Sequence, residues 1–268
     1  AYGQVLRMDT AYSFIPRYGY ALTGGLSVDN QPIWAQIDTG ASALFFTWKE
    51  WYDASSYTWL PLAHGSAARK ISKYNLCSLP EERTKRGRTQ GELLFGGGDP
   101  TLYKAPLTYI PLRSQQEYLV TLGTLQVGTG HKSIGINQPA LIDTGTQGLV
   151  IPPDHFDATL KAITDQASAT ANFTVTCDYI PALGACVIDC HHIVYLPPIE
   201  LGLGASGNAP VLVSGLYYSR DTGGGFCTVA TKRGQGSTWT LPHFILVGKY
   251  FEFQPSQQRV GIADLQRR

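Results

Sequence analysis

The chain has 268 residues, of which 43% are hydrophobic and 15% are charged, and its formal net charge is +1. A chain of this length can bury a substantial core, whereas its balanced charge excludes a general electrostatic attraction to nucleic acids or to anionic membranes. No apolar stretch approaches the roughly 18 residues of a membrane-spanning helix, so we expect a protein that neither crosses a membrane nor binds nucleic acid.

Short strands separated by tight turns dominate the predicted elements. The chain carries 29 Gly and 16 Pro residues, which punctuate runs rich in Val, Ile, Thr and Tyr. Such runs are typical of strands. A turn is predicted at residues 29–30, and a hairpin turn is predicted at residues 128–130. The predicted strands span residues 5–8, 20–28, 32–38, 92–95, 109–112, 118–122, 124–127, 211–213, 226–230 and 244–247.

A charged segment at residues 69–88 interrupts this pattern, and its Lys and Arg residues outnumber its Glu residues. The favoured interpretation is a solvated loop. The alternative is a protease-sensitive processing site at Lys85-Arg86. A nucleic-acid site is the least favoured interpretation, because no stacking aromatic residues interleave with the basic residues at 83–88.

One later segment predicts a helix. Residues 153–166 follow a proline and begin with another, and Phe156, Leu160 and Ile163 recur at the i, i+4, i+7 spacing of one helical face. The rest of the chain shows no long helical periodicity, which favours an all-β protein.

The cysteines indicate disulfides rather than a metal site. No Cys-x-x-Cys pair exists, and the adjacent His191 and His192 would point to opposite faces of a strand, which makes a poor chelate. We therefore expect no bound metal. Most of the cysteines lie in the C-terminal half, where they can form two disulfides, and the odd total leaves at least one unpaired or bonded to another molecule. The five cysteines are Cys77, Cys177, Cys186, Cys190 and Cys227.

Disulfides indicate an oxidising compartment, so we expect a secreted, extracellular protein. The sequon Asn172-Phe173-Thr174 makes Asn172 a candidate glycosylation site, in agreement with export. The first residues contain no basic and apolar leader, so a secreted form would be the mature chain.

An internal repeat identifies the candidate reactive residues. Asp38-Thr39-Gly40 and Asp143-Thr144-Gly145 share a preceding isoleucine, a small residue after the glycine, and a following leucine with two apolar residues behind it. Each block predicts a strand that stops, turns and re-enters the core, and two such blocks indicate two similar lobes. A third copy, Asp221-Thr222-Gly223, lacks the preceding apolar strand and is followed by more glycine, so we interpret it as a loop.

Two carboxylates brought face to face account for peptide hydrolysis without a metal or a cofactor. Because like charges at contact repel, Asp38 and Asp143 would share one proton, and their titration would belong to the pair. The ionised member can take a proton from water while the protonated member hydrogen-bonds the substrate carbonyl oxygen. The threonine after each aspartate can bind the opposite loop, and the following glycine permits close approach of the two loops. The alternative, that both aspartates are ordinary turn residues, does not explain their matched apolar flanks.

Further segments resemble the pepsin-like aspartic protease family. They match its end of the N-terminal lobe, interdomain strand, Leu-Pro-x-Ile stretch, C-terminal apolar-apolar-Gly strand and closing strand. These segments lie, in that order, at residues 91–103, 107–112, 195–199, 244–248 and 253–263. The resemblance implies an all-β, bilobal pepsin-like acid protease fold with a shortened N-terminal lobe. It places the reduced N-terminal lobe at residues 1–112 and the C-terminal lobe at residues 113–268.

The same resemblance implies roles for individual residues. Asp38 and Asp143 would be the catalytic pair. Thr39 and Thr144 would make an interlocking contact between the two loops. Thr146 would support Asp143 through a hydrogen bond from its hydroxyl group.

The resemblance also implies a cysteine pairing and a reaction. Cys190 and Cys227 match the disulfide of the family's C-terminal lobe, which leaves Cys177 with Cys186 as a second bridge and Cys77 free. The family cleaves polypeptides at acid pH without a cofactor. We therefore expect a monomeric endopeptidase that cleaves polypeptide substrates beside apolar residues.

The chain departs from the family between Asp38 and Gly91, where its segment is much shorter than usual. We find there neither the flap hairpin with its Tyr-x-Gly tip nor the N-terminal apolar-apolar-Gly strand, and Ala41 and Phe45 stand where the family usually has Ser and Trp. A flap closes over substrate and excludes water, so we expect an open cleft, a weaker substrate grip and broad specificity. The same departures favour an alternative function as a catalytically impaired peptide-binding or decoy member of this fold.

Overall fold

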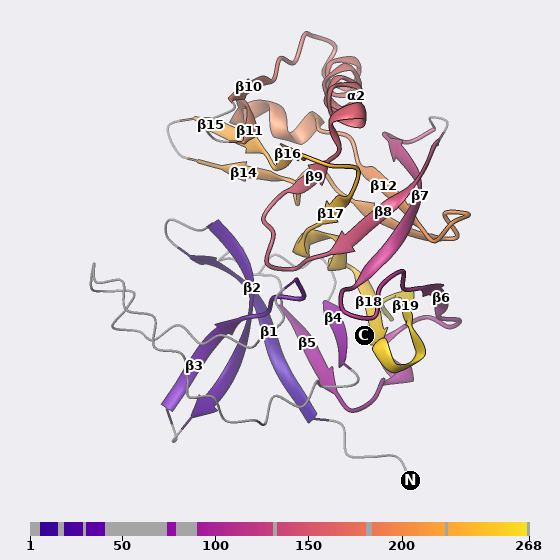
Figure 1. Ribbon diagram of the computed structural model, residues 1–268. Helices are drawn as coiled ribbons and strands as arrows, with labels where there is room; N and C mark the ends of the chain where they lie inside the picture. The colour runs from indigo at the N-terminus through magenta and orange to yellow at the C-terminus, as the bar shows by residue number, and fades with distance from the viewer. Residues whose placement is uncertain are drawn as a thin grey trace.

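The computed structural model describes residues 6–15, 19–28, 31–40, 74–78, 90–130, 133–180, 184–222 and 225–266. Within these residues the strands form three sheets of eight, seven and four strands. One long helix and several short 3-10 helices complete the described structure (Figure 1). The predicted all-β class is therefore confirmed.

The eight-stranded sheet joins the N-terminal strands to the last strands of the chain. In sheet order it contains β3 (Gln31–Gln36), β2 (Gly19–Val28), β1 (Leu6–Ile15), β5 (Gln90–Phe95), β4 (Tyr74–Ser78), β18 (Lys249–Gln254), β19 (Arg259–Asp264) and β6 (Thr108–Pro111). The yellow strand β18 pairs antiparallel with the purple strand β4, and β19 pairs with β6 (Figure 1). Residues 250–254 of β18 are all buried, so both faces of the sheet are covered there. The end of the chain thus completes a sheet that its beginning starts.

The seven-stranded sheet carries the loop that contains Asp143. In sheet order it contains β13 (Ala209–Val213), β12 (Ile199–Leu203), β7 (Leu119–Val127), β8 (Ile134–Ile142), β17 (Trp239–Leu241), β9 (Leu149–Ile151) and β16 (Thr231–Arg233). The predicted hairpin is confirmed, because β7 and β8 pair antiparallel. Gly128 and Gly130 between them have φ angles of 80° and 76°, which glycine adopts without steric cost.

Two disulfides hold the four-stranded sheet. In sheet order it contains β10 (Asp178–Ile180), β11 (Ala185–Asp189), β15 (Phe226–Val229) and β14 (Ser219–Asp221). One disulfide, Cys177–Cys186, joins the residue before β10 to β11, and the other, Cys190–Cys227, joins the residue after β11 to β15. Both predicted pairings are confirmed. Cys77 lies on β4, and its free state stays a prediction.

Replacing both Cys190 and Cys227 with Ala should lower the free energy of unfolding by about 4 kcal/mol. The physical reason is that the bridge joins residues 37 apart and so restricts the unfolded chain. Removing the Cys177–Cys186 bridge should cost less, about 2 kcal/mol, because it joins residues only 9 apart. Urea unfolding of both double variants beside the wild-type protein measures the two losses. A larger loss for the shorter loop would contradict the argument.

The predicted helix is confirmed and is longer than expected. It begins as predicted, and it continues past residue 166 because residues 167–171 are rich in alanine, the best helix former. In this helix, α2 (Pro153–Ala171), the side chains of Phe156 and Ile163 are buried and Leu160 packs beside them, so the predicted face is the one that meets the core. Among the described helices, none is long and apolar enough to cross a membrane.

The predicted strand at residues 244–247 is wrong, because η3 (His243–Leu246) is a 3-10 helix. The strand beside the Asp143 loop is β17, whose Leu241 carbonyl accepts a hydrogen bond from the Asp143 N–H at 2.9 Å. The place that the family resemblance gave to residues 244–248 is therefore corrected to β17. Pro242 has no N–H to donate to the ladder and ends this strand. All residues from 241 to 247 are buried, and a buried apolar run does not distinguish strand from helix by its periodicity.

Several predictions concern residues outside the described ranges. They are the turn at residues 29–30, the substitutions Ala41 and Phe45, the processing site Lys85-Arg86 and most of the charged segment around it. These stay predictions, as does the lobe boundary between residues 112 and 113.

Candidate active site

Both matched D-T-G blocks follow the end of a strand. Asp38 comes shortly after β3, and Asp143 comes directly after β8. The residue before each aspartate is held by the same kind of bond: the Ile37 N–H donates to Leu22 O at 2.8 Å, and the Ile142 N–H donates to Tyr118 O at 3.0 Å. The sequence repeat is thus also a repeat of local backbone structure.

The two threonines bind the opposite loop reciprocally. Thr39 N–H donates to Thr144 Oγ1 at 2.9 Å, and Thr144 N–H donates to Thr39 Oγ1 at 3.0 Å. Each hydroxyl then donates across the interface, Thr39 to Ile142 O at 2.8 Å and Thr144 to Ile37 O at 2.7 Å. Both threonine side chains are buried, so these four bonds are shielded from water. They hold the two D-T-G loops in one arrangement.

The two glycines let each carboxylate approach the opposite loop. A Cβ atom added to Gly40 would lie 2.5 Å from Asp143 Cγ, and one added to Gly145 would lie 2.6 Å from Asp38 Oδ1. Any side chain larger than glycine would therefore displace the facing carboxylate. The structure brings Asp38 and Asp143 together at the interface between the two loops.

The two carboxylates accept equivalent backbone hydrogen bonds, and Asp143 also accepts one from a side-chain hydroxyl. Gly40 N–H donates to Asp38 Oδ1 and Gly145 N–H donates to Asp143 Oδ1, each at 2.9 Å. Asp143 also accepts a bond from the Thr146 hydroxyl, which lies 2.6 Å from Oδ2. The corresponding position after Asp38 is Ala41, whose side chain has no hydroxyl group to donate. Asp143 is half-buried, whereas Asp38 is exposed.

Two basic residues that the sequence did not single out contact the Asp143 loop. Arg220 on β14 donates to Gln147 Oε1 at 2.9 Å and to Gln147 O at 3.4 Å. The buried His243 has its Nδ1 atom 3.2 Å from Thr146 O. Burial lowers the pKa of His243 from its ordinary 6.5 to about 4. In the sequence, His243 stands out only as a polar residue inside an apolar run. That pattern does not identify its hydrogen-bond partner.

Asp221 and Thr222, the described residues of the third D-T-G copy, lie on the surface. Asp221 ends β14 and is exposed, and the Thr222 hydroxyl donates to Phe226 O at 2.7 Å. The side chains of Cys190, Asp221 and Cys227 approach one another within 4.8 Å. The two sulfur atoms are joined in a disulfide, so they offer no thiolate to a metal.

The candidate glycosylation site lies at the end of α2. Asn172 follows the helix with a φ angle of 60° and is exposed, as are the two residues after it. Its side chain is therefore reachable by a modifying enzyme, and its modification stays a prediction.

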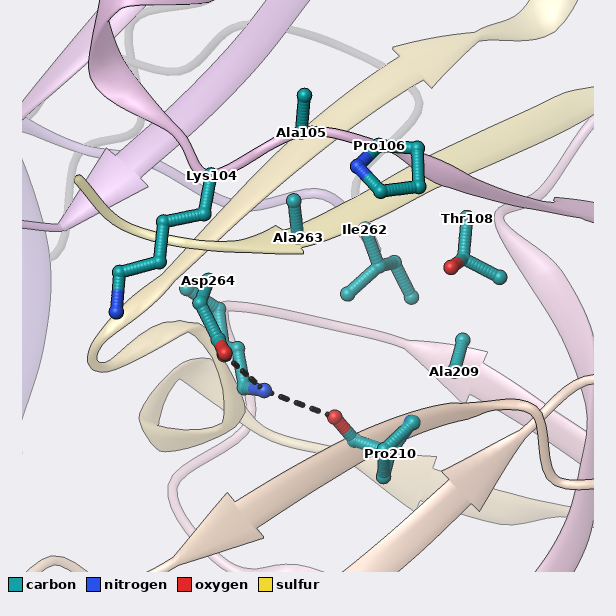
Figure 2. A pocket seen from close by; sticks show the side chains of 10 residues that line it. Lys104, Ala105, Pro106, Thr108, Ala209, Pro210, Ile262, Ala263 and Asp264 are labelled. Carbon is teal, nitrogen blue, oxygen red and sulfur yellow. Dashed lines mark hydrogen bonds and ion pairs between the residues drawn. The ribbon is translucent and has the colours of Figure 1, made fainter.

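A surface cavity of about 270 Å³ lies between β6, β13 and β19, with Lys104 at its rim (Figure 2). Lys249 Nζ donates to Pro210 O at 2.9 Å and pairs with Asp264 at 2.6 Å, and this bond lowers the pKa of Asp264. These contacts tie β18 to β13, and neither D-T-G aspartate lines the cavity. It is therefore separate from the candidate active site.

Comparisons with known proteins agree with this geometry. A family model described as eukaryotic aspartyl protease matches residues 67–265, a range that includes Asp143 and begins after Asp38. Cathepsin D of Canis lupus familiaris is 27% identical over 216 residues, which are 78% of this chain and 49% of that protein. Pepsin A of Gallus gallus is 24% identical over 185 residues, which are 68% of this chain and 45% of that protein. This chain spans about half the length of the curated relatives that it matches.

A solved structure shares the fold. Conglutin gamma, a basic 7S globulin from lupine seeds, superposes with a TM-score of 0.52 and 18% sequence identity. The superposition covers 72% of this chain and 51% of that one. Together with the family model, it confirms the predicted pepsin-like fold.

Proposed function

This chain belongs to the eukaryotic aspartyl protease family, and from that membership we propose that it is an aspartic endopeptidase with Asp38 and Asp143 as its catalytic pair. The observation that carries the proposal is the reciprocal bonding of Thr39 and Thr144. It holds each aspartate against the glycine of the opposite loop. The proposed reaction needs one ionised and one protonated carboxyl group at this place.

In the proposed reaction, the ionised carboxylate takes a proton from a water molecule, whose oxygen attacks the carbonyl carbon of the peptide bond. The protonated carboxyl group gives its proton to the carbonyl oxygen, which forms a tetrahedral diol. A proton then passes from one carboxyl group to the amide nitrogen, the C–N bond breaks while a diol hydroxyl gives its proton to the other carboxylate, and an acid and an amine leave. Thr146 orients Asp143 for these steps through its hydroxyl bond.

The proposed assignment extends to the lobes and the substrate. We assign residues 1–112 to a reduced N-terminal lobe and residues 113–268 to a C-terminal lobe whose last strands, β18 and β19, return to the N-terminal sheet. The proposed substrates are polypeptides cleaved at acid pH beside apolar residues. The proposed enzyme is a monomer and needs no metal or cofactor for the steps above.

A cleavage assay tests the proposal. Denatured protein substrate is incubated with the folded chain at pH values from about 3 to 5, with and without a peptide inhibitor that carries a hydroxyl group in place of the scissile bond, since such a group mimics the diol. We expect cleavage that the inhibitor suppresses. Absence of cleavage by a correctly folded sample at every pH would overturn the proposal.

A second candidate function rests on Ala41. Because this residue has no hydroxyl to support Asp38, the chain would be a catalytically impaired peptide-binding or decoy member of the family. The intact aspartates and threonines favour the enzyme. Peptide binding without any cleavage by the wild-type protein would favour the second function instead.

We also propose secretion, which the two disulfides support. Expression through a eukaryotic secretory pathway should attach a glycan to Asn172, because this exposed residue begins a sequon. A mass shift on treatment with an N-glycosidase, absent in Asn172→Gln, measures it. An unmodified secreted wild-type chain would contradict this prediction.

A further inference from the structure

His243 occupies an apolar site that makes its polar ring costly to bury. It starts η3, directly after Pro242, and its side chain is only 5% exposed. The ring meets Phe244 edge to face with centroids 5.8 Å apart. Since a buried polar group without a partner is strongly destabilising, the hydrogen bond that this ring makes is important.

That partner belongs to the candidate catalytic loop. Thr146 O lies 3.2 Å from His243 Nδ1. A carbonyl oxygen only accepts hydrogen bonds, so Nδ1 must carry the proton. The hydroxyl of the same Thr146 donates to Asp143 Oδ2 at 2.6 Å. One residue, Thr146, thus joins the buried ring to the aspartate, with its backbone facing His243 and its side chain facing Asp143.

Two charged residues near the ring have opposite effects on the pKa of His243. Arg220 on β14 disfavours a positive charge on His243, and Asp143 favours one. Burial is the largest influence and outweighs the hydrogen bond with Thr146 O, which favours the protonated ring, so the pKa of His243 falls to about 4. Arg220 also binds Gln147, so the loop from Asp143 to Gly148 is held from two sides.

We propose that His243 is a positioning residue, which fixes Asp143 through Thr146 while its ring is neutral and weakens that hold when the ring becomes protonated. In its neutral Nδ1–H form the ring fits its buried site and binds the carbonyl. Protonation places a second positive charge near Arg220 at a buried position, which favours a shift of η3 away from the loop. The proposal rests on the proposed function of Asp143, and it adds an acid limit to that function.

The first test measures stability and needs no substrate. Between pH 4 and 6.5 the unfolded chain binds a proton at His243 that the folded chain does not, so this residue makes stability rise with pH in that window. We expect the folding equilibrium constant of the wild type to fall by up to about 10²-fold more than that of His243→Asn between pH 6.5 and 4. Asn keeps an N–H donor but does not titrate. His191→Asn, at an exposed histidine, is the matched control and should behave as the wild type.

The second test separates kcat from KM. At pH 5, His243→Leu should lower kcat by about 10-fold with KM little changed, because Asp143 loses its orientation while substrate contacts remain. His243→Asn should recover most of that loss, and its kcat should persist to lower pH than that of the wild type. If the Leu variant does not fold, an NMR titration of the His243 ring, expected to report a pKa near 4, replaces it.

The outcomes distinguish the two proposals. If the wild type cleaves nothing, the proposed function fails, whereas the stability comparison still decides whether the folded chain disfavours a positive charge on His243. Wild-type kcat and an unchanged pH profile in His243→Leu would overturn the role of His243 and leave the protease assignment standing. The same conclusion would follow from identical pH–stability curves for the wild type and His243→Asn.

Discussion

We expect Asp143→Asn to lower kcat of the proposed peptide hydrolysis by about 10²–10⁴-fold or more. An amide cannot take a proton from water and cannot share one with Asp38, so the pair no longer activates the nucleophile. The fold should survive, because the Gly145 N–H can still donate to an amide oxygen at the Oδ1 position and the Thr146 hydroxyl oxygen can accept a bond from an amide nitrogen at the Oδ2 position. Initial rates on a peptide substrate at acid pH, beside circular dichroism of the same samples, measure both effects.

The sequence offers a matched control for this variant. Asp221 belongs to the third D-T-G copy and is exposed at the end of β14. Asp221→Asn should therefore leave the rate of hydrolysis unchanged. Full activity in Asp143→Asn would exclude the catalytic pair. If the wild type only binds peptide and Asp143→Asn binds it equally well, the peptide-binding function is the correct one.

Replacing Thr144 with Val should lower the free energy of unfolding by about 4 kcal/mol. Its hydroxyl accepts from the Thr39 N–H and donates to Ile37 O, and valine of the same shape leaves a buried N–H and a partly buried carbonyl without this partner. Each unsatisfied buried group costs about 1–3 kcal/mol. The midpoint of urea unfolding at neutral pH measures the loss.

The conservative variant separates hydrogen bonding from packing. Thr144→Ser keeps the hydroxyl and loses one methyl group, so it should cost about 1 kcal/mol. Thr146→Val removes a bond to Asp143 alone and should affect activity more than stability. A Thr144→Val protein as stable as the wild type would show that the reciprocal bonds do not hold the two loops together.

The two halves of the site differ in the groups that support each aspartate, and this difference should affect the rate of the proposed hydrolysis. Asp143 is half-buried, receives the Thr146 hydroxyl and sits on a loop that His243 and Arg220 contact. The block around Asp38 has Ala41 in the position of Thr146. We therefore expect the Asp143 loop to be a rigid contributor to the pair, since several of its groups have fixed hydrogen-bond partners.

Local patterns in the sequence identified the residues whose role depends on their neighbours in the chain. The D-T-G blocks were visible because a strand end, a carboxylate, a hydroxyl and a glycine must follow one another directly. The face of α2 was visible because Phe156, Leu160 and Ile163 repeat with the helical period. The disulfide pairs followed from the family resemblance, and the four-stranded sheet brings those cysteines together.

By itself, then, the sequence determined the all-β class, the helix and the two candidate aspartates. Tertiary structure alone decided that β18 and β19 complete the N-terminal sheet, that β17 rather than residues 244–247 flanks the Asp143 loop, and that His243 binds Thr146. The physical reason is the range of the interactions. Turn preference and periodicity act over a few residues, whereas strand pairing and buried hydrogen bonds join segments that meet only when the whole core forms.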